Sequence, residues 1–442
     1  MNSMKNLDLI SMLICSVFLF SACSNSATED TVTEPSKVEV LKIDGKWRLV
    51  VNGEEFFVKG GGCDFGPCDE IAHYGGNSFR TWNTGNEQMS AEEALDLAYK
   101  NGLMVVMGLP VVNERYGMDY DDAEAVKEQL EKLRKEVVRL KDHPALLAWG
   151  IGNELNLGST NLRVWDAVED IAKMIKEEDG NHPTTTMLAG IWKREVDYIR
   201  ENCPSLDFLS IQTYGSLINL EERIANAGYE GPYLITEWGA RGHWEVENTE
   251  WDAPIEETSS ERADGIIEKY KKSILGDSVN CMGSYVFLWG QKQERTPTWY
   301  SIYTEEGEKT EIHTAMEYLW TGEWPDHRPA RFNDIQIIGK GDRFDNVRLK
   351  PAQKYTAEID IKHHSASITL RLEIMHEASE LGFGGSFEPR PESVKKKLIS
   401  DADINNITFK SPQEPGPYRL FIYVIDDKGY ASHANLPFLV EG

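Results

Sequence analysis

Glu154 and Glu237 each close a short apolar segment that is typical of a buried strand. Glu154 ends the run Trp-Gly-Ile-Gly-Asn-Glu, and Glu237 ends the run Tyr-Leu-Ile-Thr-Glu. Two carboxyl groups that face one another can cleave a glycosidic bond, because one protonates the leaving oxygen while the other acts from the opposite face of the ring. The pair therefore predicts a sugar-cleaving enzyme. The alternative is that Glu154 caps a helix and Glu237 is a surface acid.

The spacing of the two glutamates predicts which elements carry them. They are 83 residues apart. A (β/α)8 barrel of roughly 250 residues uses about 30 residues for each strand and helix, which puts the glutamates on strands four and seven. Active sites of such barrels lie at the carboxyl ends of the strands, so both acids are expected on the same face.

Alternating strand and helix patterns support a barrel. We expect barrel strands at residues 56–62, 77–82, 103–110, 145–153, 184–189, 206–214, 233–236 and 283–289. We expect helices at residues 91–99, 121–140, 162–177, 220–227 and 260–275. Two turn signals, Asp44-Gly45 and Asn52-Gly53, predict a hairpin in residues 38–55 that closes the bottom of the barrel.

The composition changes after Pro329. All 12 tryptophans lie between Trp47 and Trp324, and the later part of the chain shows alternation of apolar and polar residues instead. The fold class is therefore predicted as α/β, a (β/α)8 barrel over residues 38–325 followed by an immunoglobulin-like β-sandwich over residues 330–442. Without tryptophan platforms, the sandwich is expected to be a packing module rather than a sugar-binding one.

The first residues predict a targeting segment. Residues 9–20 are nearly all apolar but too short to span a bilayer, and they lead to Ser-Ala-Cys. Residues 1–22 resemble a lipoprotein signal with Cys23 as the lipidated residue, and an ordinary secretory signal is the alternative. The polar residues 23–37 would be a flexible tether. Acids just after Cys23 resemble the surface-export tethers of Bacteroidetes lipoproteins, which implies the cell surface, or the periplasmic face, of the outer membrane.

Charge and motifs limit the partners. The net charge of −27 argues against nucleic acid and anionic lipid surfaces, so the membrane would be met only through the lipid anchor. We expect a monomer whose partner is a polysaccharide or oligosaccharide. No phosphate-binding glycine motif and no zinc spacing occur, so no cofactor and no metal are expected. Cys63 and Cys68 are placed to form a disulfide, or else to remain free thiols.

The strand-end motifs resemble those of clan A retaining glycosidases. Asn153-Glu154 ends strand four and Glu237 ends strand seven, which implies Glu154 as general acid/base and Glu237 as nucleophile. The resemblance assigns roles to four further positions: Arg80 beneath the nucleophile, Asn153 on the sugar 2-hydroxyl, Tyr214 as donor to Glu237, and Trp289 as a stacking platform. Each has a structural alternative: a salt bridge, a cap, a satisfied buried tyrosine and a core tryptophan. Candidates for outer subsites are Trp82, Trp192, Trp238, Trp244 and Trp251.

The domain order and the glutamate spacing resemble glycoside hydrolase family 158. The short motifs Gly-Asn-Glu-Leu-Asn and Ile-Thr-Glu-Trp-Gly are shared loosely with families 2 and 5. The resemblance implies an endo-β-1,3-glucanase acting on laminarin-type glucan. The alternatives are a β-mannanase or an exo-β-glycosidase on the same barrel, and a non-catalytic glycan-binding lipoprotein.

Overall fold

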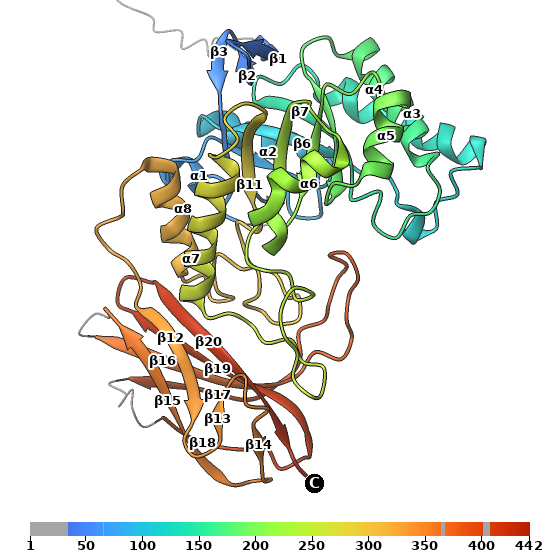
Figure 1. Ribbon diagram of the computed structural model, residues 1–442. Coiled ribbons are helices and arrows are strands. Elements are labelled where there is room, and N and C mark those ends of the chain that lie inside the picture. Colours follow the sequence, from blue (N-terminus) through green and yellow to red (C-terminus); the bar gives the residue numbers. More distant parts are fainter. Residues whose placement is uncertain (1–33, 65, 364–366, 401–406) are drawn as a thin grey trace, which may run out of the picture. The chain divides into compact units, whose positions relative to one another are not determined.

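The computed structural model describes residues 34–442 except residues 65, 364–366 and 401–406 (Figure 1). The predicted signal, Cys23 and the first part of the predicted tether lie outside the described residues. Among the helices of the described part, none is long and apolar enough to cross a membrane.

Eight parallel strands close into a barrel in the order β10-β11-β4-β5-β6-β7-β8-β9, which confirms the predicted fold class. Most of their residues are buried, as expected for parallel strands that helices cover from outside. The strands are β4 (Val58–Gly62), β5 (Ser78–Arg80), β6 (Met104–Leu109), β7 (Leu146–Asn153), β8 (Thr184–Ala189), β9 (Phe208–Gln212), β10 (Tyr233–Trp238) and β11 (Cys281–Val286).

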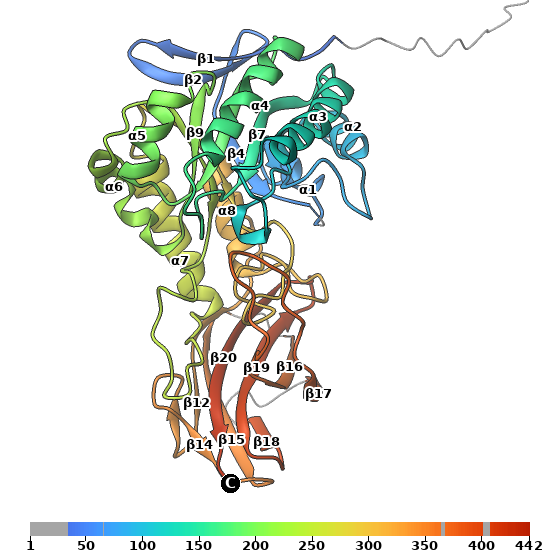
Figure 2. The same cartoon turned by 90° about the vertical axis from the view of Figure 1, so that its right-hand side faces the viewer.

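The helices lie around these strands (Figures 1 and 2). They are α1 (Glu70–His73), α2 (Ala91–Lys100), α3 (Ala123–Leu140), α4 (Val164–Glu178), α5 (Lys193–Asn202), α6 (Leu220–Ala227), α7 (Ser259–Lys269) and α8 (Glu311–Thr321), with short 3-10 turns at Glu114–Tyr116 and Gly215–Asn219 and a π-helical turn at Tyr270–Ile274. Helix α3 begins at the cap Asp122, whose side chain accepts hydrogen bonds from two backbone amides of the first turn. Helices α1, α5 and α8 were not among the predicted ones.

The predicted hairpin near the N-terminus has a third strand. Strands β1 (Val38–Ile43), β2 (Lys46–Val51) and β3 (Glu54–Phe56) form an antiparallel sheet. Its turns place Asp44 and Asn52 at positive φ, each followed by a glycine, which suits tight hairpin turns. Leu49 of β2 belongs to the same apolar cluster as Val58 and Leu147 of the barrel, so the sheet closes the end of the barrel opposite the carboxyl ends of its strands.

The C-terminal part is a sandwich of two sheets, as predicted, with strand orders β13-β12-β15-β18 and β14-β20-β19-β16-β17. Apolar side chains from both sheets, such as Phe332, Leu372 and Phe438, form one core. The strands are β12 (Arg331–Ile337), β13 (Gly341–Asp342), β14 (Arg348–Leu349), β15 (Lys354–Lys362), β16 (Ile368–His376), β17 (Ser393–Ser400), β18 (Ile407–Lys410), β19 (Gly416–Asp426) and β20 (Ala431–Val440).

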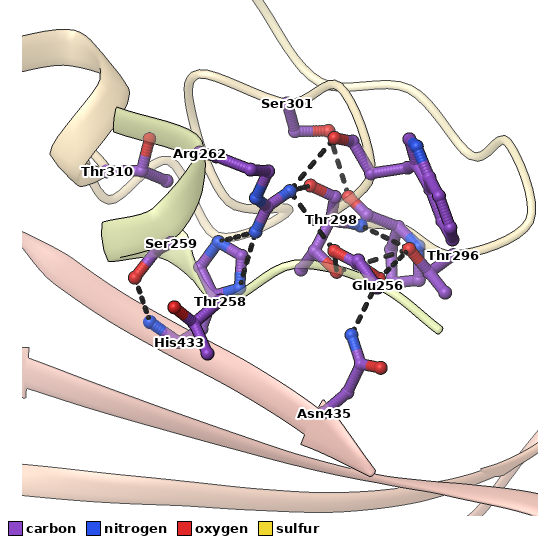
Figure 3. A network of polar contacts seen from close by, with 12 residues as sticks. Glu256, Thr258, Ser259, Arg262, Thr296, Thr298, Ser301, Thr310, His433 and Asn435 are labelled. Carbon is purple, nitrogen blue, oxygen red and sulfur yellow. Dashed lines mark hydrogen bonds and ion pairs between the residues drawn. The ribbon is translucent and has the colours of Figure 1, made fainter. Parts of the chain in front are cut away.

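A buried polar network joins helix α7 and the loop after β11 to strand β20 (Figure 3). The Arg262 guanidinium donates to the backbone carbonyl of Trp299 (2.9 Å) and lies 3.1 Å from both Glu256 Oε1 and the His433 ring. Glu256 also accepts a hydrogen bond from the Asn435 side chain at 2.6 Å. Burial, helped by the charge of Arg262, lowers the pKa of His433 well below its usual value, so its ring is neutral. The sandwich thereby fixes the loop that carries Trp299 and its neighbour Tyr300.

Candidate active site

Glu237 lies near the carboxyl end of β10 and receives hydrogen bonds on both carboxyl oxygens. Oε1 accepts from Trp82 Nε1 (2.7 Å), Gln212 Nε2 (2.9 Å) and Arg80 Nη1 (3.1 Å). Oε2 accepts from the hydroxyl of Tyr214 (2.9 Å). A carboxyl group that meets only donors suits the acceptor-only carboxylate, and four donors at the ends of two strands, β5 and β9, fix its orientation. This is what a positioned nucleophile requires.

Asn153 at the end of β7 is held by two of these four side chains, Arg80 and Gln212. Its Oδ1 accepts from Arg80 Nη2 at 2.9 Å and from Gln212 Nε2 at 2.7 Å. Because both neighbours are donors, the side-chain amide of Asn153 must point its oxygen toward them. Its Nδ2 then points in another direction. Asn153 Nδ2 has no acceptor among the described residues and is therefore free to donate to a ligand.

Glu154 follows Asn153 with a backbone φ of +51°, in the left-handed region that residues other than glycine seldom adopt. Surrounding contacts hold this conformation. Its amide donates to the Met187 carbonyl at 3.0 Å, and its carbonyl accepts from Asn113 Nδ2 at 3.0 Å and Arg115 Nη1 at 3.2 Å. Such local strain is a feature of functional sites.

The surroundings of the Glu154 carboxyl group differ from those of Glu237. Burial, followed by the negative charge of Glu237, raises the pKa of Glu154 to about 8, while Arg115 and Arg80 act in the opposite direction. No hydrogen bond to this carboxyl group is found among the described residues. Glu154 is thus a protonated acid near neutral pH, and no hydrogen bond to a described residue holds its proton. The neighbouring carboxylate of Glu237, by contrast, accepts hydrogen bonds on both oxygens. Two carboxyl groups in such unlike environments match the division between proton donor and nucleophile.

Aromatic side chains surround the ring of Tyr214, which follows β9. Its ring packs against Phe287 (centroids 5.9 Å apart) and Tyr300 (5.2 Å). Burial raises the pKa of Tyr214 well above its usual value, so the hydroxyl remains a donor to Glu237. Trp244, in the loop after β10, meets Tyr214 edge-on at 5.6 Å and is 60% exposed. That loop therefore borders the site.

The prediction for Trp289 is wrong. Strand β11 ends at Val286, and the Trp289 amide beyond it donates to the carbonyl of Gly62, the last residue of β4, at 2.9 Å. The Trp289 side chain is fully buried, donates to the Pro67 carbonyl and stacks on Trp320 of α8 at 5.2 Å. It is a core residue between the barrel and α8, with no ring face free for a sugar. Phe287, two residues earlier, contacts Tyr214 and Trp82 in its place.

Gln212 and Asp64 are site residues that the sequence reasoning missed. Gln212 ends the strand Phe-Leu-Ser-Ile-Gln two residues before Tyr214, and this alternation was a usable signal because both side chains then point to the same face. Asp64 follows β4 and accepts from the Trp82 amide at 3.4 Å. Burial, opposed by that amide and by Arg80, raises the pKa of Asp64 to about 6.

Cys63 and Cys68 form a disulfide in the loop that carries Asp64, with their Cα atoms 5.8 Å apart. The disulfide excludes the alternative of two free thiols at these positions. Cys203 and Cys281 are buried free cysteines. Within the described ranges, no group of three or more His, Cys, Asp or Glu side chains is arranged to hold a metal ion.

The sequence matches one known protein family over much of its length. The model described as "Glycosyl hydrolases family 2, TIM barrel domain" matches residues 75–302, more than half of the chain. The match spans both glutamates. The chain belongs to glycosyl hydrolase family 2.

Individual family 2 relatives are distant. The β-glucuronidase of Sus scrofa is 21% identical over 247 residues, covering 51% of this chain and 37% of the relative. The β-glucuronidase of Paenibacillus borealis is 26% identical over 144 residues, covering 26% of this chain and 23% of the relative. The solved β-D-glucuronidase of Dictyoglomus thermophilum has a TM-score of 0.51 at 17% identity, covering 66% of this chain and 54% of that one. The chain thus spans well under two thirds of the length of these proteins, and the solved structure supports the fold alone.

The family match corrects two predictions. The resemblance to family 158 is wrong, and the endo-β-1,3-glucanase activity that it implied is wrong with it. The physical reason is that the short motifs around Glu154 and Glu237 encode the catalytic ends of two strands, which related families share. They carry no information on the outer loops that select the glycan. The alternative of an exo-acting β-glycosidase on the same barrel agrees better with family 2.

Proposed function

We propose that the protein is a retaining, exo-acting β-glycosidase, and that β-D-glucuronides are the first substrates to test. The observation that carries the proposal is the contrast between the two glutamates: Glu237 is held by four donors, whereas Glu154 has an unengaged carboxyl group with a raised pKa. Family membership and two relatives named β-glucuronidase support the sugar class.

The first chemical step forms a covalent ester with the enzyme. A carboxylate oxygen of Glu237 attacks the anomeric carbon, the glycosidic bond breaks, and Glu154 gives its proton to the departing oxygen. Arg80, Trp82 and Tyr214 hold Glu237 in line for this attack. The free Nδ2 of Asn153 donates to the sugar 2-hydroxyl, a hydrogen bond that strengthens in the transition state.

The second step releases the sugar. Glu154, now ionised, takes a proton from a water molecule, and the resulting hydroxide attacks the anomeric carbon and displaces Glu237. Two inversions give a product with the configuration of the substrate. Glu154 can change from acid to base because ester formation removes the negative charge of Glu237. Without that charge beside it, the pKa of Glu154 falls.

A panel of p-nitrophenyl β-D-glycosides tests the proposal. The sugars are glucuronic acid, galacturonic acid, glucose, galactose and mannose, and Glu237→Ala is the control for background hydrolysis. We expect hydrolysis of the glucuronide, with free monosaccharide from the first minutes. Cleavage of another sugar in the panel would overturn the substrate class while keeping the mechanism. Binding without hydrolysis of any glycoside would establish a non-catalytic barrel and overturn the proposal.

A further inference from the structure

The connection between β16 and β17 of the sandwich is much longer than a hairpin requires. It comprises residues 377–392, hereafter the 377–392 loop, whereas hairpin loops commonly have about 2–5 residues. The loop leaves the sandwich and reaches the barrel, where it contacts segments on two sides of the catalytic glutamates. Figure 1 shows it as the orange-red loop that rises from the sandwich toward the barrel.

On one side, the 377–392 loop contacts the segment that carries Glu154. Arg115 donates through Nη1 to the carbonyl of Glu154 (3.2 Å) and through Nη2 to the carbonyl of Gly384 (3.4 Å). The hydroxyl groups of Tyr116 and Ser386 lie 2.9 Å apart. Arg115 therefore joins the proposed acid to the loop through one side chain.

The backbone of the loop also packs closely here. A Cβ atom at Gly384, whose φ is +59°, would lie 2.7 Å from the side chain of Leu157, three residues beyond Glu154. A residue with a side chain would not fit at this position without a shift of Leu157. The contact is thus a direct one between the loop and the segment after β7.

On the other side, the loop contacts the segment after β11. Lys292 Nζ donates to the Gly385 carbonyl at 3.0 Å and lies 5.7 Å from the centre of the Phe287 ring. The buried carboxylate of Glu388 accepts from the backbone amide (2.6 Å) and the guanidinium (2.9 Å) of Arg295. These contacts hold the loop between two of the segments that frame the site.

Between these anchor points the loop exposes large apolar side chains. Phe387 is 88% exposed and Phe383 is 60% exposed. Phe383 lies close to Gly158, in the same segment as Glu154 and Leu157. Exposed aromatic rings on an anchored loop beside a site indicate a surface that a ligand covers.

We propose that the 377–392 loop forms the leaving-group subsite of the enzyme, with Phe387 and Phe383 as its apolar platform. Glu154 delivers its proton to the leaving oxygen, so structures joined directly to Glu154 face the leaving group rather than the sugar held over Glu237. The occupant is the aglycone, either an aromatic group or the apolar face of a second pyranose. This inference rests on the proposed function, and it assigns the sandwich a part in specificity.

Two substrates with the same sugar but different leaving groups distinguish an effect on this subsite from an effect on the catalytic centre. 4-Methylumbelliferyl β-D-glucuronide has a large flat leaving group, whereas β-D-glucuronosyl fluoride has a single atom there. The measured quantity is kcat/KM, because it reports the step in which the leaving group departs. If the panel identifies another sugar, the same pair is used with that sugar.

Phe387→Ala and Phe383→Ala should each lower kcat/KM for the umbelliferyl glycoside by about tenfold, as expected for the loss of one aromatic contact, and leave the fluoride within about twofold. Phe387→Tyr keeps the ring and should retain activity on both substrates. Phe344→Ala is the matched control, because Phe344 is another exposed phenylalanine of the sandwich (51%) outside the loop.

Equal losses on both substrates, or no loss on either, would overturn the inference while leaving the proposed function intact. Failure of the wild-type protein to hydrolyse either substrate or any panel glycoside would instead overturn the proposed function. Circular dichroism of each variant identifies any loss of folding, which is not expected at side chains so exposed.

Discussion

At the level of single residues, the proposed chemistry depends on the different surroundings of Glu154 and Glu237. Glu237 is oriented by Arg80, Trp82, Gln212 and Tyr214, and its negative charge helps to keep the proton on Glu154. The charge of Glu237 thus helps to set the protonation state of Glu154. This effect can be measured, because removing the charge of Glu237 must shift the titration of Glu154.

The pH dependence follows from the raised pKa of Glu154. An acid catalyst is active only while protonated, so kcat/KM should fall as pH rises through about 8, far above the ordinary glutamate value of 4.5. In Glu237→Gln the neighbouring negative charge is lost, so the pKa of Glu154 should fall. Carbon NMR of labelled glutamate carboxyl groups in both proteins measures this shift. An unchanged or higher pKa in the variant would contradict the coupling.

Gln212 supplies a second prediction at this scale. Its Nε2 joins Asn153 to Glu237, and a hydrogen bond to a charged group contributes about 1.5–3 kcal/mol. Gln212→Leu should therefore lower kcat/KM by roughly 10- to 100-fold. Thermal unfolding at an unchanged temperature would show that the fold is retained. Full activity in the folded variant would show that Gln212 does not contribute to catalysis.

The sequence predicted part of this arrangement and missed part of it. Arg80, Asn153 and Tyr214 lie together around Glu237, since residues at the ends of parallel strands meet at one face. Trp289 failed the same reasoning because its strand ends three residues earlier. Gln212 was overlooked because a single amide in a buried strand carries little weight without knowledge of its spatial neighbours.

At the element scale, the network around Arg262 holds the loop after β11 in place. Arg262 and Glu256 are almost fully buried, and removal of one partner of such a pair leaves an uncompensated charge. Arg262→Ala should lower the free energy of unfolding by about 3–5 kcal/mol. Urea denaturation measures this loss.

Arg348→Ala is the control for that change. Arg348 pairs with Glu250 at 2.6 Å, but both side chains are substantially exposed, and exposed pairs contribute at most about 1 kcal/mol. Equal destabilisation by the two variants would show that the Arg262 network has no special role in holding the sandwich against the barrel.

The strands were easier to predict than the helices. Strand β8 begins and ends at the predicted residues, and most other barrel strands differ by one to three residues at each end, because a buried parallel strand is a short apolar run between polar segments. Helix α5 was missed because its sequence, Lys-Arg-Glu-Val-Asp-Tyr-Ile-Arg-Glu-Asn, has few apolar residues to mark a periodicity. The 377–392 loop gave no signal, since its function depends on contacts far away in the sequence.

At the scale of the whole molecule, the barrel and the sandwich should unfold together. The Arg262 network and the anchors of the 377–392 loop join them through buried groups. All tryptophans precede Pro329, so fluorescence reports on the barrel alone, whereas far-ultraviolet circular dichroism reports on both parts. The two signals should show one coincident thermal transition. A second transition seen only by circular dichroism would mean that the sandwich unfolds independently.

The substrate was the least predictable property at this scale. Barrel and glutamates follow from local patterns, but many activities share one fold. The loops around the glutamates come from separate elements, including the sandwich, and no short motif encodes their meeting. Hence the sequence reasoning reached a barrel glycosidase and named the wrong family within it.

In the proposed mechanism, Glu237 becomes covalently bound to the sugar. A 2-deoxy-2-fluoro-β-D-glucuronosyl fluoride, or its analogue with the sugar that the panel identifies, slows release of the intermediate enough for mass spectrometry of the intact protein and its peptides. We expect one added fluorosugar per chain, on the peptide that contains Glu237. A label on another residue, or an active enzyme that releases its product with inverted configuration and is never labelled, would contradict the proposed mechanism.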